Sequence, residues 1–111
     1  MVVYFRTTKL QKLCNSKREA VRKWGPAMAS KLMQRLQELE AADSLADISR
    51  VPPPRCHELI GDRAGQISVD LVQPQRLLFI PANDPVPRAE DGGLDWSKVT
   101  EIEIIEIADT H

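Results

Sequence analysis

The chain has 111 residues, of which 42% are apolar, 28% are charged and only 5% are aromatic. This length and composition suit one domain that buries about two thirds of its unfolded surface, so we expect a single domain over residues 1–111. No run approaches the roughly 20 apolar residues of a membrane helix, and the N-terminal sequence MVVYFRTTKL is too polar for a secretory signal. We therefore expect a cytoplasmic protein with no membrane partner.

The formal net charge of -1 conceals an uneven distribution of charge along the chain. Residues 1–35 carry nine Lys or Arg and one acidic residue, which makes their net charge +8. The net charge is -3 over residues 36–80 and -6 over residues 81–111. Two interpretations stay open: solvated surfaces of opposite charge that attract each other in the fold, or a surface that binds a polyanion.

The start of the sequence predicts a short strand followed by helices. A β-prone run over residues 2–5 leads into a Thr-Thr pair that can cap a helix. Apolar residues then recur at helical spacing as far as Gly25, with an interruption at Asn15 and Ser16. This pattern predicts two short helices or one kinked helix.

A third helix is predicted to begin at Pro26, because proline suits the first helical turn. Its apolar face consists of Met28, Leu32, Met33, Leu36 and Leu39. Arg35 falls on the opposite, polar face, and the helix should end near residues 42–43. A single capped turn follows over residues 44–48. The three prolines at 52–54 have no N–H groups to donate and predict a stiff, extended connector.

The second half of the chain has the period of two that is typical of strands. Strands are predicted over Cys56–Leu59, Gln66–Leu71, Arg76–Ile80 and Thr100–Ala108. Turns at 61–65 and 72–75 and a long loop at 82–97 separate them. The alternation slips at Ile105, which predicts a β-bulge or a strand buried on both faces.

Together these elements predict an α+β fold, in which helices cover one face of a mostly antiparallel sheet. The last four strands form a meander, and the N-terminal strand joins one of them. The sequence leaves open which strand that is.

The two cysteines, Cys14 and Cys56, are interpreted as small buried hydrophobic residues. The chain has no CxxC motif and no Cys/His ligand spacing, so it indicates neither a zinc site nor a disulfide framework. No metal and no cofactor are predicted.

The residues that can carry chemistry near neutral pH are the histidines, His57 and His111. Arg76 opens an otherwise apolar strand, where a guanidinium must meet an anion or reach water. If the four strands are neighbours, His57, Arg76 and His111 converge on one surface. Two imidazoles and an arginine can move protons at a phosphate and stabilise its developing charge. A structural role for solitary strand histidines is the alternative.

The segment CHELIGDRAGQISVDLVQPQRLLFIP, followed by a strand that ends EIIEIADTH, resembles toxins of the RelE/ParE superfamily. The similarity is greatest to the HigB-like, or plasmid-maintenance killer-protein, branch. That branch has the pattern H-x-L-K-G-D-R-x-G, then an arginine that opens a later strand, then a C-terminal D-Y-H. The resemblance covers essentially the whole chain and implies a RelE-like fold.

The resemblance also implies a function, that of the toxin of a type II toxin-antitoxin system. Such toxins are neutralised by a cognate antitoxin, often a helix-turn-helix protein. The HigB and RelE branches are endoribonucleases that cut mRNA on the ribosome and inhibit translation. The ribose 2′-OH attacks the adjacent phosphate, with no metal or cofactor.

The matching positions imply roles for five residues of this chain. His57 is the proton-transfer group, and Arg76 stabilises the phosphorane. His111 is a second acid/base or phosphate-positioning group. Arg63 and Asp109 are supporting residues.

Two departures from the pattern keep other functions open. Ile60 stands where the family usually has a lysine, which removes a cation at the phosphate. Thr110 stands where the family has a tyrosine, which removes a ring that stacks on a base. The alternatives are a non-catalytic toxin of the gyrase-binding ParE type and an inactivated relic that only binds its antitoxin.

Overall fold

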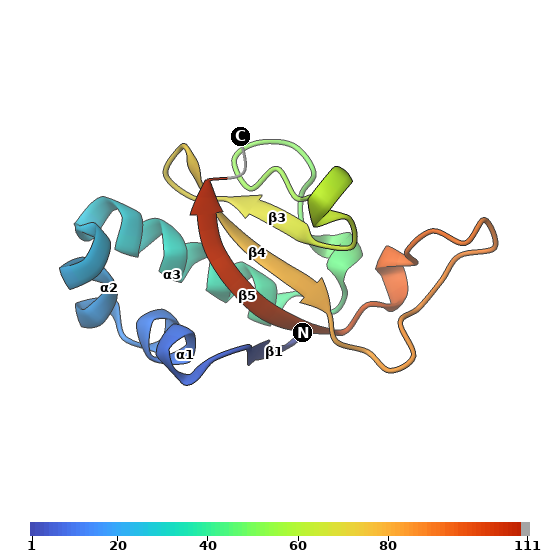
Figure 1. Cartoon of the computed structure of the whole chain (residues 1–111), viewed down its shortest axis with the longest axis horizontal. Helices are drawn as coiled ribbons and strands as arrows, with labels where there is room; N and C mark the ends of the chain where they lie inside the picture. Colours follow the sequence, from blue (N-terminus) through green and yellow to red (C-terminus); the bar gives the residue numbers. More distant parts are fainter. Residues whose placement is uncertain (110–111) are drawn as a thin grey trace.

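The structure is a computed structural model, which describes residues 1–109. Within these residues a five-stranded sheet has the order β1-β5-β4-β3-β2 (Figure 1). Its strands are β1 (Val2–Phe5), β2 (His57–Glu58), β3 (Ile67–Asp70), β4 (Gln75–Pro81) and β5 (Glu101–Asp109). The meander from β2 to β5 is antiparallel, as predicted, and β1 pairs in parallel with β5.

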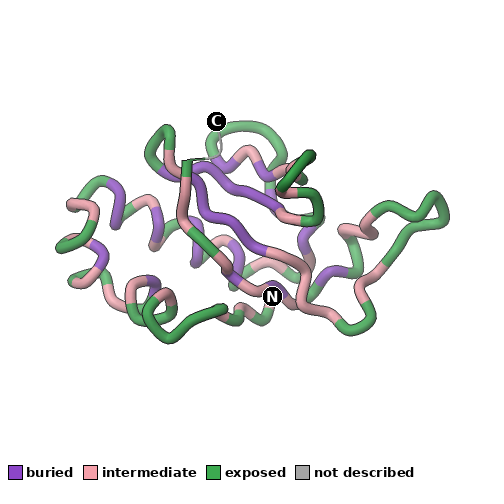
Figure 2. Tube along the Cα trace, viewed as in Figure 1, coloured by how far each residue is buried: buried purple, intermediate pink, exposed green. Residues whose placement is uncertain are grey.

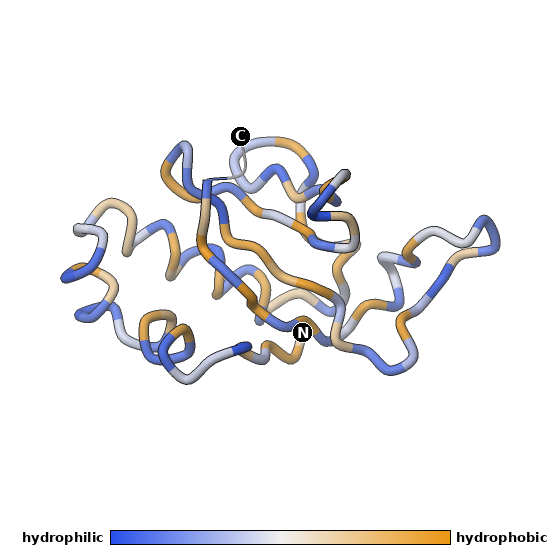
Figure 3. Tube along the Cα trace, viewed as in Figure 1, coloured by the Kyte–Doolittle hydropathy of each residue, from blue (hydrophilic) through white to orange (hydrophobic). Residues whose placement is uncertain are grey.

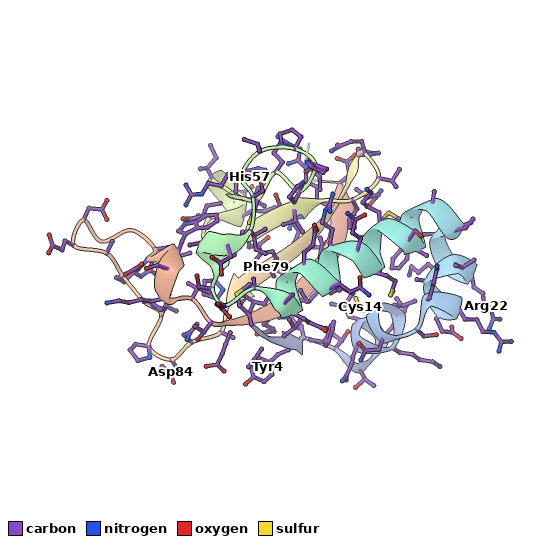
Figure 4. The ribbon with its side chains drawn as sticks, turned by 180° about the vertical axis from the view of Figure 1, so that it is seen from behind. Tyr4, Cys14, Arg22, His57, Phe79 and Asp84 are labelled. Carbon is purple, nitrogen blue, oxygen red and sulfur yellow. The ribbon has the colours of Figure 1, made fainter. Side chains whose placement is uncertain are left out.

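Three helices pack on one face of the sheet, which confirms the predicted α+β class. They are α1 (Thr8–Asn15), α2 (Lys17–Trp24) and α3 (Pro26–Ala41). Short 3-10 turns occur at Leu45–Asp47, Gly61–Arg63 and Trp96–Lys98. Seen from behind, α3 runs across the sheet (Figure 4). None of the helices in the described part of the chain has the length and apolar character required to traverse a bilayer.

The break between α1 and α2 is a helix cap. The Ser16 hydroxyl accepts a hydrogen bond from the Glu19 N–H at 3.2 Å, so it ends one helix and begins the next. Of the two predicted alternatives, two short helices is therefore correct.

The core lies between the sheet and α3. Its buried side chains include Ile67 and Val69 of β3, Leu77 and Phe79 of β4, Ile102 and Ile104 of β5, and Leu32, Leu36 and Leu39 of α3. Figure 2 shows this burial along the central strands and on α3, and Figure 3 shows the apolar run of β4 at the centre of the sheet. Cys14 and Cys56 belong to the same core, as predicted.

The predicted irregularity at Ile105 is a β-bulge. Leu78 lies opposite Glu106 and Phe79 opposite Ile104, so Ile105 is the extra residue of β5. The bulge shifts the alternation, which lets both Ile104 and Ile107 pack against the core.

Two local predictions were wrong. Arg35 was expected on the polar face of α3, but it is only 2% exposed, because its guanidinium reaches the carbonyl of Asp70 and the carboxylate of Glu38. The prolines at 52–54 were expected to be extended, but they form a turn. The first N–H group after them, that of Arg55, donates to the carbonyl of Val51 at 3.1 Å.

Candidate functional site

The register of the sheet places His57 and Arg76 on the face opposite the helices. In β3, Ile67 and Val69 point to the core, so Ser68 and Asp70 point away from it. Ser68 lies opposite His57 on one side, and Asp70 lies opposite Arg76 on the other. The two predicted site residues therefore flank β3 on the face opposite the helices, where Ser68, Asp70 and Arg76 are themselves buried.

Arg76 shares a carboxylate with a second arginine. Its Nε lies 3.5 Å from Oδ1 of Asp70, and both side chains are at least nine-tenths buried. Arg55 contacts both oxygens of the same carboxylate, with Nε 2.8 Å from Oδ2 and Nη2 3.2 Å from Oδ1. This hydrogen bonding raises the pKa of Arg55, so the guanidinium is charged at any working pH.

The backbone of Asp70 is held as firmly as its side chain. Its N–H donates to the carbonyl of Pro54 at 2.8 Å, and its carbonyl accepts from Nε of Arg35, also at 2.8 Å. Arg35 donates in turn to Glu38 at 2.7 Å. Arg55 and Arg76 therefore contact the carboxylate of Asp70, while Arg35 contacts its backbone carbonyl and pairs with Glu38.

His57 is half-buried, and its hydrogen bond determines its tautomer. Nδ1 lies 2.9 Å from the backbone carbonyl of Arg55. A carbonyl can only accept, so Nδ1 carries the proton and the neutral ring keeps its lone pair on Nε2. This is the arrangement that a general base requires.

The remaining predicted residues lie along β5 and the turn beside it. Nη1 of Arg63 contacts Glu106 and Gln66, each at 3.1 Å, and so ties the 61–63 turn to the sheet. Asp109 is the last residue of β5 and lies opposite Gln75, next to Arg76 in β4. His111 and Thr110 lie outside the described residues.

Sequence reasoning did not predict that Asp70, Arg55 and Arg35 lie in contact with one another beside Arg76. The sequence did contain an indication for Asp70. It stands two residues after Ser68 in a predicted strand, so the two side chains share the face opposite Ile67 and Val69. Nothing in the sequence linked Arg55 to it, because the contact depends on how the proline turn folds back.

Within residues 1–109, no group of three or more His, Cys, Asp or Glu side chains comes together in an arrangement that could hold a metal ion. The two cysteines are not reactive thiols. Burial raises the pKa of Cys14 and of Cys56 to about 12, so both are protonated at neutral pH.

The basic residues of α1 and α2 lie away from this site. The exposed members are Lys9, Lys12, Lys17, Arg18, Arg22 and Lys23. In Figure 4 Arg22 lies near one end of the long axis, and His57 lies well away from it near the middle of the molecule. The two charged regions of the sequence nevertheless meet at β5, because Nε of Arg6 lies 2.8 Å from Oε2 of Glu103.

Comparison with known proteins finds a similar fold. The YoeB/ParE toxin from Agrobacterium tumefaciens matches this chain with a TM-score of 0.59 and 12% sequence identity, and the match covers 100% of both chains. No protein-family model and no curated protein sequence matches the chain. The chain thus shares its fold with this YoeB/ParE toxin, in agreement with the RelE-like fold expected from the sequence.

Proposed function

We propose that this chain, as one domain over residues 1–111, is the toxin of a type II toxin-antitoxin system. The similar fold of a YoeB/ParE toxin supports this class. We further propose that it is a ribosome-dependent mRNA endoribonuclease of the HigB-like type that inhibits translation in the cytoplasm. The observation that carries this activity is the placement of His57 and Arg76 on the sheet face opposite the helices, on either side of β3.

The proposed reaction needs no metal, because the substrate supplies its own nucleophile. Nε2 of His57 takes the proton of the ribose 2′-OH, and the oxygen attacks the adjacent phosphorus. The charge that develops on the phosphorane oxygens is stabilised by Arg76. The 5′ oxygen leaves with a proton from His111, which yields a 2′,3′-cyclic phosphate and a 5′-OH end.

Supporting roles are proposed for Arg63 and Asp109. Arg63 contacts Glu106 on the same face of the sheet. Its guanidinium would be a second cation, after Arg76, that attracts the phosphate. Asp109 precedes the C-terminal residues and would orient His111.

The experiment is induction of the chain in cells, with mapping of mRNA ends and cleavage assays on purified translating ribosomes. We expect growth arrest and new mRNA ends for the wild type, and loss of both in His57→Ala, Arg76→Ala and His111→Ala. Intact mRNA on the ribosomes would sink the endoribonuclease proposal.

A second candidate is a non-catalytic toxin of the gyrase-binding type. The observation that favours it is the burial of Arg76 beside Asp70, together with a separate basic surface on α1 and α2. In that case Arg22→Glu and Lys23→Glu abolish toxicity, His57→Ala does not, and a DNA-supercoiling assay shows inhibition. A wild type that causes no growth arrest but co-purifies with an antitoxin would identify an inactive relic.

The proposed partner is a cognate antitoxin, with the helix-turn-helix type expected from the family resemblance. Co-expression with the product of the neighbouring reading frame tests it. We expect a stable complex that relieves growth arrest.

A further inference from the structure

Arg55 contacts both halves of the proposed active site. Its carbonyl accepts the proton of His57 Nδ1 at 2.9 Å. Its guanidinium holds both oxygens of the Asp70 carboxylate, which also lies beside Arg76.

The backbone of Arg55 adopts a conformation that is unfavourable in free energy. Its φ angle is 47°, in the left-handed region that residues other than glycine seldom adopt. Such a conformation persists only where surrounding contacts determine it. Those contacts are the bond to Val51 on the backbone and the two-point contact with Asp70 on the side chain.

Asp70 is the fixed point of the arrangement. Its N–H donates to the carbonyl of Pro54. Its carbonyl accepts from Arg35, and its carboxylate accepts from Arg55. The side chain therefore has little freedom to rotate, and a guanidinium bound to it is held at a set position on the sheet face.

We propose that Arg55 and Asp70 form a positioning pair, which orients His57 through the Arg55 carbonyl and Arg76 through the Asp70 carboxylate. The role of this pair in catalysis rests on the proposed function. The pair does not react with RNA. It keeps the His57 ring in the Nδ1–H tautomer, so that Nε2 faces the substrate with a free lone pair.

The test is the tautomer of His57, measured by long-range 1H–15N NMR correlation above the pKa of the ring. We expect the Nδ1–H form in the wild type. In Arg55→Asn, which tolerates a positive φ but lacks the guanidinium, we expect a shift toward the Nε2–H form. Asp70→Asn should shift it in the same direction.

The matched control is Arg50→Asn. Arg50 belongs to the same segment and carries the same charge, but it stacks on the ring of Trp96, 3.8 Å from its centroid. This variant should keep the wild-type tautomer. If Asp70→Asn does not fold, Arg55→Asn decides alone, because the Arg55 side chain is 38% exposed. A wild type in the Nε2–H form, or an unchanged tautomer in Arg55→Asn, overturns the inference.

A second arm measures mRNA cleavage on translating ribosomes. Misplacing a proton-transfer group costs about 100-fold in rate, so we expect kcat to fall by about 10- to 100-fold in Arg55→Asn with little change in KM. If the wild type itself leaves mRNA intact, the proposed function fails. The NMR result still decides the positioning pair.

Discussion

The carboxylate of Asp70 on β3 and the guanidinium of Arg76 on β4 lie 3.5 Å apart, and both are buried in the sheet face. Their Cα atoms are register partners, so the pair depends on the correct alignment of two strands. Because Asp70 also pairs with Arg55, we expect the loss of Asp70 to reduce the stability of the fold more than the loss of Arg76.

Asp70→Asn should destabilise the fold by about 3–5 kcal/mol, because it removes the carboxylate that pairs with the buried Arg76 and with Arg55. Arg76→Met should cost less than this, since methionine keeps the apolar stem of arginine and Asp70 keeps its contact with Arg55. Urea unfolding of both variants gives the two free energies. Equal losses would contradict the description of Asp70 as the centre of the cluster.

Stability should fall with pH in the alkaline range because of the cysteines. The pKa of each buried thiol is about 12, against an ordinary value of 9.0. Unfolded thiols ionise above pH 9.0 while folded ones stay protonated, so stability is full below that pH. It is then lost as the pH rises toward 12, by about 1.4 kcal/mol per pH unit and thiol.

Unfolding free energies between pH 8 and 10 measure this slope. The control is the variant Cys14→Ala with Cys56→Ala, whose slope should be smaller. Thiol reagents at pH 8 should react with the wild type only after denaturation. Rapid reaction of the native protein would show that the thiols are accessible.

Ser16→Ala should lower stability by about 1 kcal/mol, because it removes the acceptor for the Glu19 N–H at the start of α2. Ser30→Ala is the matched control. Ser30 is exposed within α3, where alanine is the better helix former, so this change should be neutral or slightly stabilising. Thermal unfolding of the two variants separates the cap from a general effect of serine removal.

Ile60→Lys should strengthen RNA binding under the proposed function. Ile60 is 90% exposed, so the change should alter stability by less than about 0.5 kcal/mol. One new phosphate contact should steepen the salt dependence of ribosome or RNA binding by about 0.7–0.9 in log–log slope. Ile60→Gln removes the same apolar side chain without adding charge, and an equal gain from it would refute the electrostatic explanation.

The sequence by itself predicted the features that depend on neighbouring residues. The change of period after the prolines separated the helical half from the meander, and the slip at Ile105 located the bulge opposite Leu78 and Phe79. The cap at Ser16 followed from its hydroxyl and position. Each is a local preference of the backbone, so a short stretch of sequence contains the information.

Only the tertiary structure decided which distant residues meet. The parallel pairing of β1 with β5, the burial of Arg35 and the contact of Arg55 with Asp70 each join segments that lie far apart in the sequence. Sequence analysis proposed His57 and Arg76 as site residues, because histidine and a strand arginine stand out by chemistry. It could not identify Asp70 as the residue that contacts Arg76 and Arg55. These contacts depend on the strand register and on a turn that brings Arg55 back to β3.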